Sequence, residues 1–405
     1  MFTDIVITNF RSIENARVRL APVTILYGPT GSGKSSFSYA LCILRNFAVN
    51  PNQSSDALFN LGFINLGNYS DCVYNHDSER TIGLQATFGP AQDTMPSTFG
   101  FTFNAITAEI QNGVPGFSQQ TKVSLPYPVN QSLNNPLDGF VINWNGITST
   151  ATPKETPSPE STTDPLAEAS KLATRLNAAP EALRRIDIVP PSRGFFQPYY
   201  SPVPTTPFLT TELEVATLIM NPSDQYLKFR ISSYLEKILD RRFDTFMPPG
   251  TATVYFQTLE KESNTPVNLV NDAFGVNQVI YLLAKILRQE SRTIIIEEPE
   301  VHLHPRVIQK FAKACIDFAK LEKKQLIFTT HSSAFLTAFA ASVAIGQLET
   351  SDVCLIEASR DRRNTILTSR SISEDGQIEG GLGVFDDPSL EDLEAVLQAR
   401  KKANG

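Results

Sequence analysis

The sequence predicts an α/β protein with a mixed, largely parallel and doubly wound sheet, and two observations lead to that fold class. From residue 267 onward, apolar patterns of helical and strand type alternate, which is typical of parallel sheets covered by helices. Near the N-terminus, an apolar strand over 23–27 runs into a glycine-rich loop and then into an apolar segment too long for one strand, which predicts a buried helix beginning near Lys34. Strand, loop and helix follow in the order that a phosphate-binding site needs.

The other N-terminal elements are predicted from alternating hydrophobicity and turn residues. Residues 2–20 predict two strands joined by a turn, because β-branched and aromatic residues alternate there with polar ones. Short alternating bursts between 60 and 145, separated by Asn, Gly, Pro and Ser, predict an antiparallel β region. Residues 148–165 are poor in apolar residues and dense in Pro, Ser and Thr, so we expect an exposed, flexible loop.

The remaining chain is predicted to be helical first and then alternating. Helical patterns cover 166–186 and 211–246, and neither extends into the sustained heptads of a long coiled coil. The alternating part is predicted as helix, strand, helix, strand, helix and strand over 275–289, 292–298, 305–320, 324–330, 333–344 and 352–359.

We expect three parts in the chain. Residues 1–147 form an N-terminal lobe with the glycine-rich loop and a β subdomain, 148–265 form the flexible loop with an inserted helical region, and 266–405 form a C-terminal lobe with a short closing segment.

Composition limits the classes of function. The 405 residues carry 35 Lys plus Arg against 42 Asp plus Glu, a net charge of -7, so no global positive field draws the protein onto nucleic acid or anionic lipid. No apolar run reaches the roughly 20 residues of a membrane span. Scattered cysteines and the absence of a signal-like N-terminus predict a soluble, cytoplasmic protein with neither disulfides nor a zinc site. The cysteines are Cys42, Cys72, Cys315 and Cys354.

A phosphate-binding loop is predicted by a complete match to G-x-x-x-x-G-K-[ST]. Its glycines let backbone N–H groups turn toward a β-phosphate, Lys34 reaches the β and γ oxygens, and the Ser35 hydroxyl is suited to Mg²⁺. The predicted ATP-binding residues of this loop are Gly28, Pro29, Thr30, Gly31, Ser32, Gly33, Lys34, Ser35 and Ser36.

Two carboxylates follow three consecutive isoleucines at the end of a predicted buried parallel strand. Strand ends of this kind lie beside the phosphates in such sheets. One acid is needed near Mg²⁺ and another to activate the attacking water, so we assign Glu297 with Ser35 to the metal and Glu298 to the general base.

Three of the four histidines lie just after the two strands that should point at the nucleotide. His331 follows the strand over 324–330, and we expect it to contact the γ-phosphate or a second subunit. His302 and His304 offer two nitrogens for zinc, but no third ligand stands at suitable spacing.

These motifs together resemble the ABC-type ATPases of the recombination, chromosome-structure and OLD (overcoming lysogenization defect) group. The glycine-rich loop corresponds to Walker A, EEPEVHLHP to Walker B and TTHSS to the switch motif. ITNFRSI, INLGNYSDCVYNHD, VPPSRG and NDAFGVNQ are similar to further segments of compact OLD-like members. The resemblance spans residues 5 to about 336. The roughly fifty residues after Ile356 show no strand-acid-strand repeat, so no Toprim nuclease domain is expected.

The resemblance implies a head-to-tail homodimer that sandwiches two ATP molecules with Mg²⁺. In this group the segment containing Gly275, Asn277 and Gln278 reaches the nucleotide bound by the other subunit. The same resemblance makes Glu297 the Mg²⁺-side acid, Glu298 the base, 301–304 the inter-subunit loop and His331, with Lys34, part of the catalytic set.

The chain also departs from the family pattern. Ala273 and Asn277 stand where the family often has Gly and Ser, so an Asn amide would replace a serine hydroxyl at the trans contact. Asn65, Asn68 and Asp71 are either the equivalent of the glutamine loop or turn residues. Arg193 faces nucleotide, partner or nucleic acid, or is an ordinary surface arginine.

The leading hypothesis is an ATP hydrolase that acts as motor or sensor in anti-phage defence or DNA repair, with a separate effector protein. The alternative is a slow ATP-dependent clamp on DNA or protein in chromosome maintenance. Direct DNA contact by the basic pairs 184–185 or 241–242 is left open, as is an oligomer larger than a dimer. A membrane-transporter subunit is disfavoured because the signature LSGGQ is missing.

Overall fold

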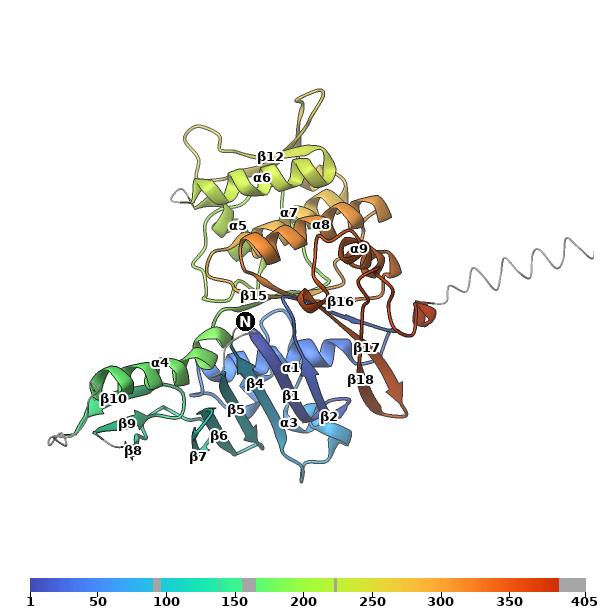
Figure 1. Cartoon of the computed structure of the whole chain (residues 1–405). Helices are drawn as coiled ribbons and strands as arrows, with labels where there is room; N and C mark the ends of the chain where they lie inside the picture. The colour runs from blue at the N-terminus through green and yellow to red at the C-terminus, as the bar shows by residue number, and fades with distance from the viewer. Residues whose placement is uncertain (90–95, 138, 155–164, 222–223, 386–405) are drawn as a thin grey trace, which may run out of the picture.

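The computed structural model describes residues 1–89, 96–137, 139–154, 165–221 and 224–385, and it confirms the predicted α/β class (Figure 1). A central six-stranded sheet has the order β11-β15-β16-β3-β17-β18, in which the first five strands are parallel and β18 is antiparallel. Its strands are β11 (Ile186–Val189), β15 (Thr293–Glu297), β16 (Gln325–Thr330), β3 (Val23–Tyr27), β17 (Val353–Asp361) and β18 (Asn364–Arg370).

Strands β11, β15, β16 and β3 of the central sheet are buried along their whole length, which explains why they are largely apolar runs without polar alternation. In β15, Ile294 and Ile296 face one hydrophobic core while Ile295 faces the other. The first core lies against helices α5 to α9, which cover one face of the sheet (Figure 1). These helices are α5 (Glu212–Met220), α6 (Gln225–Leu239), α7 (Phe274–Leu287), α8 (Pro305–Leu321) and α9 (Ser333–Ala344).

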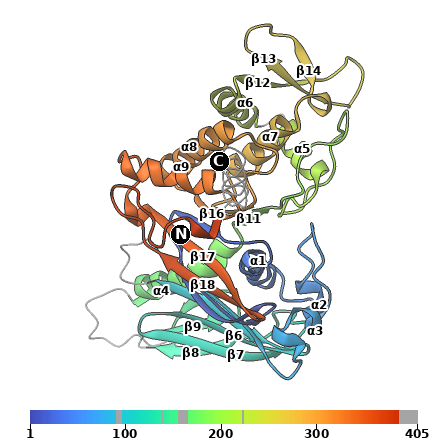
Figure 2. The same ribbon diagram turned by 90° about the vertical axis from the view of Figure 1, so that its right-hand side faces the viewer.

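The second core is formed around α1 (Lys34–Val49), which begins at the predicted residue. Figure 2 shows α1 between the central sheet and a second, antiparallel sheet of order β2-β1-β4-β5-β6-β7. That sheet confirms the antiparallel region predicted from alternation. Its strands are β1 (Phe2–Phe10), β2 (Ile13–Arg19), β4 (Ile82–Phe88), β5 (Ser97–Phe103), β6 (Thr107–Val114) and β7 (Phe117–Ser124).

Two small antiparallel sheets complete the described part of the chain. One contains β8 (Leu133–Leu137), β9 (Phe140–Trp144) and β10 (Ser149–Pro153) and packs on α4 (Pro165–Leu183). The other contains β12 (Arg241–Phe246), β13 (Tyr255–Glu260) and β14 (Pro266–Asn268), and it lies beside α6 (Figure 2). The short helical turns are α2 (Ser55–Leu58), α3 (Tyr69–Cys72), η1 (Tyr74–His76), η2 (Leu269–Asn271), η3 (Thr350–Asp352) and η4 (Gly383–Phe385).

Three sequence expectations differ from the structure. Residues 149–153 were expected in a loop but form β10, because backbone pairing with β9 satisfies a segment that has few apolar side chains. Residues 241–246 were expected to be helical but form β12, since Asp240 ends α6 in a left-handed conformation and the chain turns back. The closing segment contributes β18, whose pairing with β17 no periodicity indicated. The rest of the expected flexible loop, 155–164, lies outside the described residues.

No helix in the described part of the chain is long and apolar enough to cross a membrane. The predicted boundaries at 147/148 and 265/266 stay predictions.

Candidate functional site

The phosphate-binding loop, Gly28–Ser35, connects β3 to α1 at the carboxyl edge of the central sheet. Its glycines are required by space and by backbone angle. Gly33 has φ +98°, and a Cβ there would lie 2.0 Å from Thr365 Oγ1; a Cβ on Gly28 would lie 2.1 Å from the Ala358 carbonyl oxygen. The predicted loop residues therefore form one turn, and strands β17 and β18 pack closely against it.

Lys34, at the start of α1, is 6% exposed and donates to backbone carbonyls of its own loop. Its Nζ lies 2.8 Å from the Gly28 oxygen and 3.0 Å from the Pro29 oxygen. Burial lowers the pKa of Lys34 to about 8, while the nearby carboxylates of Glu298, Glu300 and Glu297 oppose that shift. The ammonium group thus lies where a phosphate oxygen would replace its carbonyl partners.

Glu297 ends β15 and is 1% exposed. Its Oε2 accepts a hydrogen bond from Tyr39 Oη at 3.3 Å, while Oε1 is buried without a hydrogen-bond partner among the described residues. Burial raises the pKa of Glu297, and hydrogen bonding by Ser35 and Tyr39 opposes this. An orphaned carboxylate oxygen beside a serine hydroxyl is the oxygen donor set that Mg²⁺ takes, so these residues fit the ion.

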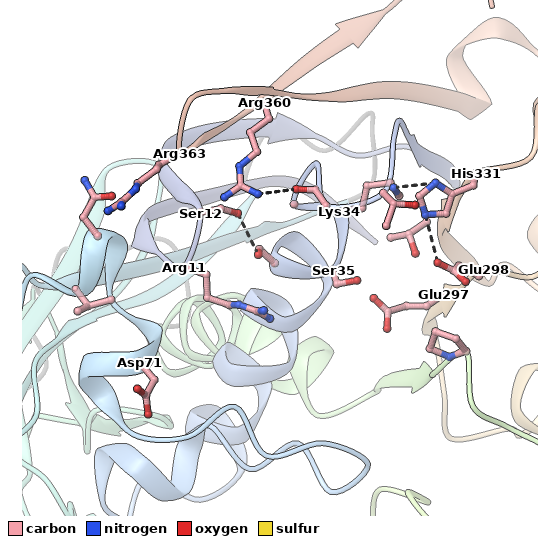
Figure 3. Close-up of a pocket in the computed structure, with 18 of the residues that line it drawn as sticks. Arg11, Ser12, Lys34, Ser35, Asp71, Glu297, Glu298, His331, Arg360 and Arg363 are labelled. Carbon is pink, nitrogen blue, oxygen red and sulfur yellow. Dashed lines mark hydrogen bonds and ion pairs between the residues drawn. The ribbon is translucent and has the colours of Figure 1, made fainter. Parts of the chain in front are cut away.

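Glu298 and His331 meet across the ends of β15 and β16, and Lys34 completes the row (Figure 3). His331 Nε2 lies 3.3 Å from Glu298 Oε1, and His331 Nδ1 lies 3.4 Å from Lys34 Nζ. A ring protonated on Nε2 satisfies both contacts, because Lys34 can only donate. The three predicted catalytic residues are therefore brought together.

The backbone around Glu298 is held in an unusual conformation. Glu298 has φ +47°, a left-handed angle that costs energy for a residue with a side chain, and its N–H donates to the Thr329 oxygen at 2.8 Å. Glu300 follows and accepts from Thr330 Oγ1 and His331 N, both at 2.7 Å. Glu300, which sequence reasoning gave no role, thus fixes the start of the histidine loop.

A cleft of about 690 Å³ joins these groups into one site. Figure 3 shows Glu298 and His331 on one side of Ser35 and the guanidinium groups of Arg11, Arg360 and Arg363 on the other. The sequence analysis assigned no role to these arginines. Arg11 lies inside the quoted ITNFRSI segment, whereas only the fold brings the hairpin that carries 360 and 363 to the cleft.

Arg193 is buried and is not among the residues that line the cleft. It is 2% exposed, and its guanidinium donates to the carbonyl oxygens of Glu297 at 2.7 Å, Glu298 at 2.8 Å and Pro190 at 3.0 Å. Burial lowers the pKa of Arg193 to about 10, so it is charged at neutral pH. The correction follows from packing: the residue holds the backbone of the two acids.

The segment Phe274–Gln278 opens α7 and lies away from the cleft lining. Asn277 was expected to offer its amide to a second subunit. Instead, its Oδ1 accepts from Phe195 N and its Nδ2 donates to the Phe195 oxygen, both at 2.7 Å. Gln278 is 2% exposed and its Nε2 lies 3.5 Å from the Arg193 oxygen. Both side chains are internal because they replace the missing backbone partners of 193–195.

Gly275 in the same segment has a different environment. A Cβ there would lie 2.8 Å from the His302 oxygen, so α7 begins in close contact with the loop over 301–304. Phe274 contacts the His302 ring edge-on at 4.7 Å between centroids. The expected inter-subunit role of Gly275 and of 301–304 stays a prediction.

The other candidates form contacts within their own segments. His304 accepts from Arg306 N at the start of α8, and Asn68 caps α3 together with Asp71, which also lines the cleft. Asn65 accepts from Gly67 N within a turn. Among the described residues, no group of three or more His, Cys, Asp and Glu could hold a metal ion.

The two basic pairs differ in their surroundings. Arg241 lies 3.5 Å from Asp272, and Arg242 contacts Asn264. Arg184 and Arg185 are exposed at the end of α4. Direct DNA contact by either pair stays a prediction.

One family model matches most of the chain. A family model described as an AAA domain, putative AbiEii toxin, of a type IV toxin–antitoxin system matches residues 23–337. No curated protein sequence matches the chain.

Among solved structures, an Smc head bound to the C-winged helix domain of ScpA is similar, with a TM-score of 0.51 at 11% identity, covering 92% of this chain and 98% of that one. An Smc head with an extended coiled coil, bound to the C-terminal domain of ScpA derived from Pyrococcus furiosus, has a TM-score of 0.48 at 10% identity, with 99% of both chains covered. An SMC head domain from Thermotoga maritima has a TM-score of 0.44 at 10% identity, covering 91% of this chain and 98% of that one. The first of these shows a common fold.

Proposed function

The chain belongs to the family of AAA domains described as putative AbiEii toxins of type IV toxin–antitoxin systems, and from this premise we propose that it is a Mg²⁺-dependent ATP hydrolase. One observation carries the proposal. Lys34 of the phosphate-binding loop contacts Nδ1 of His331, and the Glu298 carboxylate contacts Nε2 of the same ring. A γ-phosphate bound at Lys34 would therefore lie beside the group that activates water.

The reaction is an in-line attack of water on the γ-phosphate. The water oxygen bonds to the γ-phosphorus as the bond to the β–γ bridging oxygen breaks, Glu298 takes the proton, and ADP and phosphate leave. Lys34 offsets the negative charge on the phosphate oxygens, and His331 keeps the Glu298 carboxylate oriented toward the water. Mg²⁺, held by Ser35 and Glu297, would supply further charge neutralisation.

The proposed hydrolase acts as a head-to-tail homodimer. None of the residues that line the cleft comes from Phe274–Gln278, so a single chain supplies the lysine, the base and the metal residues but no group from this segment. A second copy would place its Gly275 backbone N–H against the γ-phosphate. The internal bonds of Asn277 leave the backbone as the contacting group.

The cellular role proposed for this hydrolase is that of a motor or sensor in anti-phage defence or DNA repair, with a separate effector protein. The resemblance of Walker A, EEPEVHLHP and TTHSS to OLD-like ATPases supports it, and the family description is consistent with it. The alternative is a slow ATP-dependent clamp on DNA or protein. The likeness to an Smc head supports the fold that either role needs.

Light scattering combined with phosphate release tests the proposal. We expect the wild type to release phosphate and Glu298→Gln to stop doing so while accumulating an ATP-dependent dimer. Gln keeps the size of the side chain but cannot take a proton, so its hydrolysis should fall by about 100-fold or more. If the mass is unchanged by ATP and Glu298→Gln still turns over, both the base and the dimer are wrong.

A further inference from the structure

The hairpin formed by β17 and β18 packs directly on the phosphate-binding loop, although it lies outside the residues that the family model matches. Thr365 Oγ1 donates to the Ser32 oxygen at 3.0 Å, and Arg360 Nη1 donates to the Gly31 oxygen at 3.1 Å. Thr365 N also donates to the Ser12 oxygen at 2.7 Å. These bonds fix the hairpin tip, Asp361–Asn364, at the outer end of the cleft.

The outer end of the cleft carries three guanidinium groups without carboxylate partners. None of Arg11, Arg360 and Arg363 forms an ion pair within the described residues. Arg11 lies over the Tyr39 ring, 5.3 Å from its centroid, and its Nη1 is buried without a hydrogen-bond partner. Asp71 also lines the cleft, and its carboxylate accepts from Asn68 N at 3.0 Å.

The direction of a bound nucleotide follows from the proposed function, on which this inference rests. The γ-phosphate must lie at the Glu298 and His331 end for water to be activated there. The nucleoside must then extend past Ser35 toward the arginines (Figure 3). Among the described residues that line the cleft there is no Phe, Tyr or Trp, and the aromatic rings there are the imidazoles of His76 and His331.

We propose that the β17–β18 hairpin is the nucleoside-recognition element of this site and that Arg363 stacks its planar guanidinium on the base. Guanidinium planes stack on nucleobases as aromatic rings do. Arg363 suits this role because it has neither a hydrogen bond nor an ion pair among the described residues, whereas Arg360 is held by the Gly31 oxygen. Figure 3 shows the Arg363 side chain at the end of the cleft opposite Glu298.

Calorimetric titration of the full chain with ATP and with inorganic tripolyphosphate, both with Mg²⁺, separates base recognition from phosphate binding. We expect Arg363→Ala to weaken the affinity for ATP by about tenfold, because the stacked cation is lost. The affinity for tripolyphosphate should change by less than about twofold. The matched control is Arg362→Ala. Arg362 is the neighbouring exposed arginine of the same turn; it lines an adjoining hollow together with Arg363, but it does not line the cleft. It should change neither ligand.

Three outcomes would overturn the inference. Unchanged ATP affinity in Arg363→Ala removes the contact. If Arg363→Ala weakens the binding of ATP and of tripolyphosphate equally, Arg363 attracts phosphate by its charge and does not recognise the base. If Arg363→Ala and Arg362→Ala have equal effects, the contact is not specific to Arg363. In each case wild-type ATP binding and hydrolysis leave the proposed function intact, whereas a wild type that binds tripolyphosphate and ATP equally well, without hydrolysis, contradicts both.

Discussion

The two halves of the proposed ATP machinery differ in how much one chain provides. At the cleft, Lys34 and Glu298 both contact His331, and Glu297 lies beside Ser35 with a buried oxygen that has no hydrogen-bond partner among the described residues. At the start of α7, the polar side chains of Asn277 and Gln278 point inward and bind the backbone of 193–195. The cleft therefore presents polar groups that a ligand could contact, whereas the polar side chains at the start of α7 are part of the protein interior.

The difference shows how the second region could still serve the first. Arg193 donates to the carbonyl oxygens of both acids, and its own carbonyl oxygen lies next to Gln278. A continuous set of hydrogen bonds thus joins the start of α7 to the backbone of Glu298. We infer that the α7 side chains position the acids of their own subunit and that the half-buried Gly275 backbone is the part of this segment left for the proposed contact with another chain.

The largest effect should come from removing the lysine of the cleft. Lys34→Ala deletes a buried positive charge aimed at the phosphates, so we expect ATP affinity to fall by about 4 kcal/mol, roughly 1000-fold. Calorimetric titration checks this. Lys310→Ala, an exposed lysine paired with Asp240 on another face, is the control and should bind ATP normally. Tight ATP binding by Lys34→Ala would place the phosphates elsewhere.

Arg193→Met tests the connection between the two regions. The carbonyl oxygens of Pro190, Glu297 and Glu298 would lose their buried donor, so we expect the free energy of unfolding to fall by about 3 kcal/mol and hydrolysis to drop with it. Urea unfolding and phosphate release are the measurements. Exposed Arg184→Met should stay within about 0.5 kcal/mol of wild type. Wild-type stability in Arg193→Met would show that the backbone of Glu297 and Glu298 keeps its conformation without Arg193.

Asn277→Leu distinguishes an internal role from a trans role. Two buried backbone groups of Phe195 would lose their partner, and we expect a loss of about 2 kcal/mol in unfolding free energy without any nucleotide present. The neighbouring exposed Asn271→Leu is the control. Normal stability together with loss of the ATP-dependent dimer would restore the expectation drawn from the family pattern.

The smallest effect concerns pH. Because the pKa of Lys34 is lowered to about 8, the ammonium group loses its proton above that pH in the nucleotide-free protein. Only the protonated form attracts phosphate, so ATP affinity is fully present below pH 8 and should fall by up to about tenfold per unit above it. Titrations between pH 7 and 9.5 measure this. Lys34→Arg stays charged throughout and should show a flat profile; a sloping one would assign the pH dependence to another group.

Sequence reasoning was most successful where one local pattern has one physical meaning. The glycine-rich loop before Lys34 and the isoleucines before Glu297 correctly predicted strand ends at one sheet edge. It was wrong at 241–246, where polar residues at helical spacing are compatible with either state and pairing with β13 decided for a strand. It left Arg193 open, since nothing in PPSRG tells whether an arginine contacts solvent or three buried carbonyl oxygens.

The sequence by itself determined the chemistry that this protein has at its disposal: a loop that can surround a phosphate, an adjacent lysine and serine, and acids and a histidine after apolar strands. Those assignments depend on the type of each residue and on the order of neighbouring residues, both of which can be read directly from one sequence. Only the tertiary structure decided which groups converge. It placed Arg360 and Arg363, more than 300 residues from the loop, at the end of the cleft, and it turned Asn277 inward. Such contacts depend on sheet order and helix packing, and no local pattern encodes them.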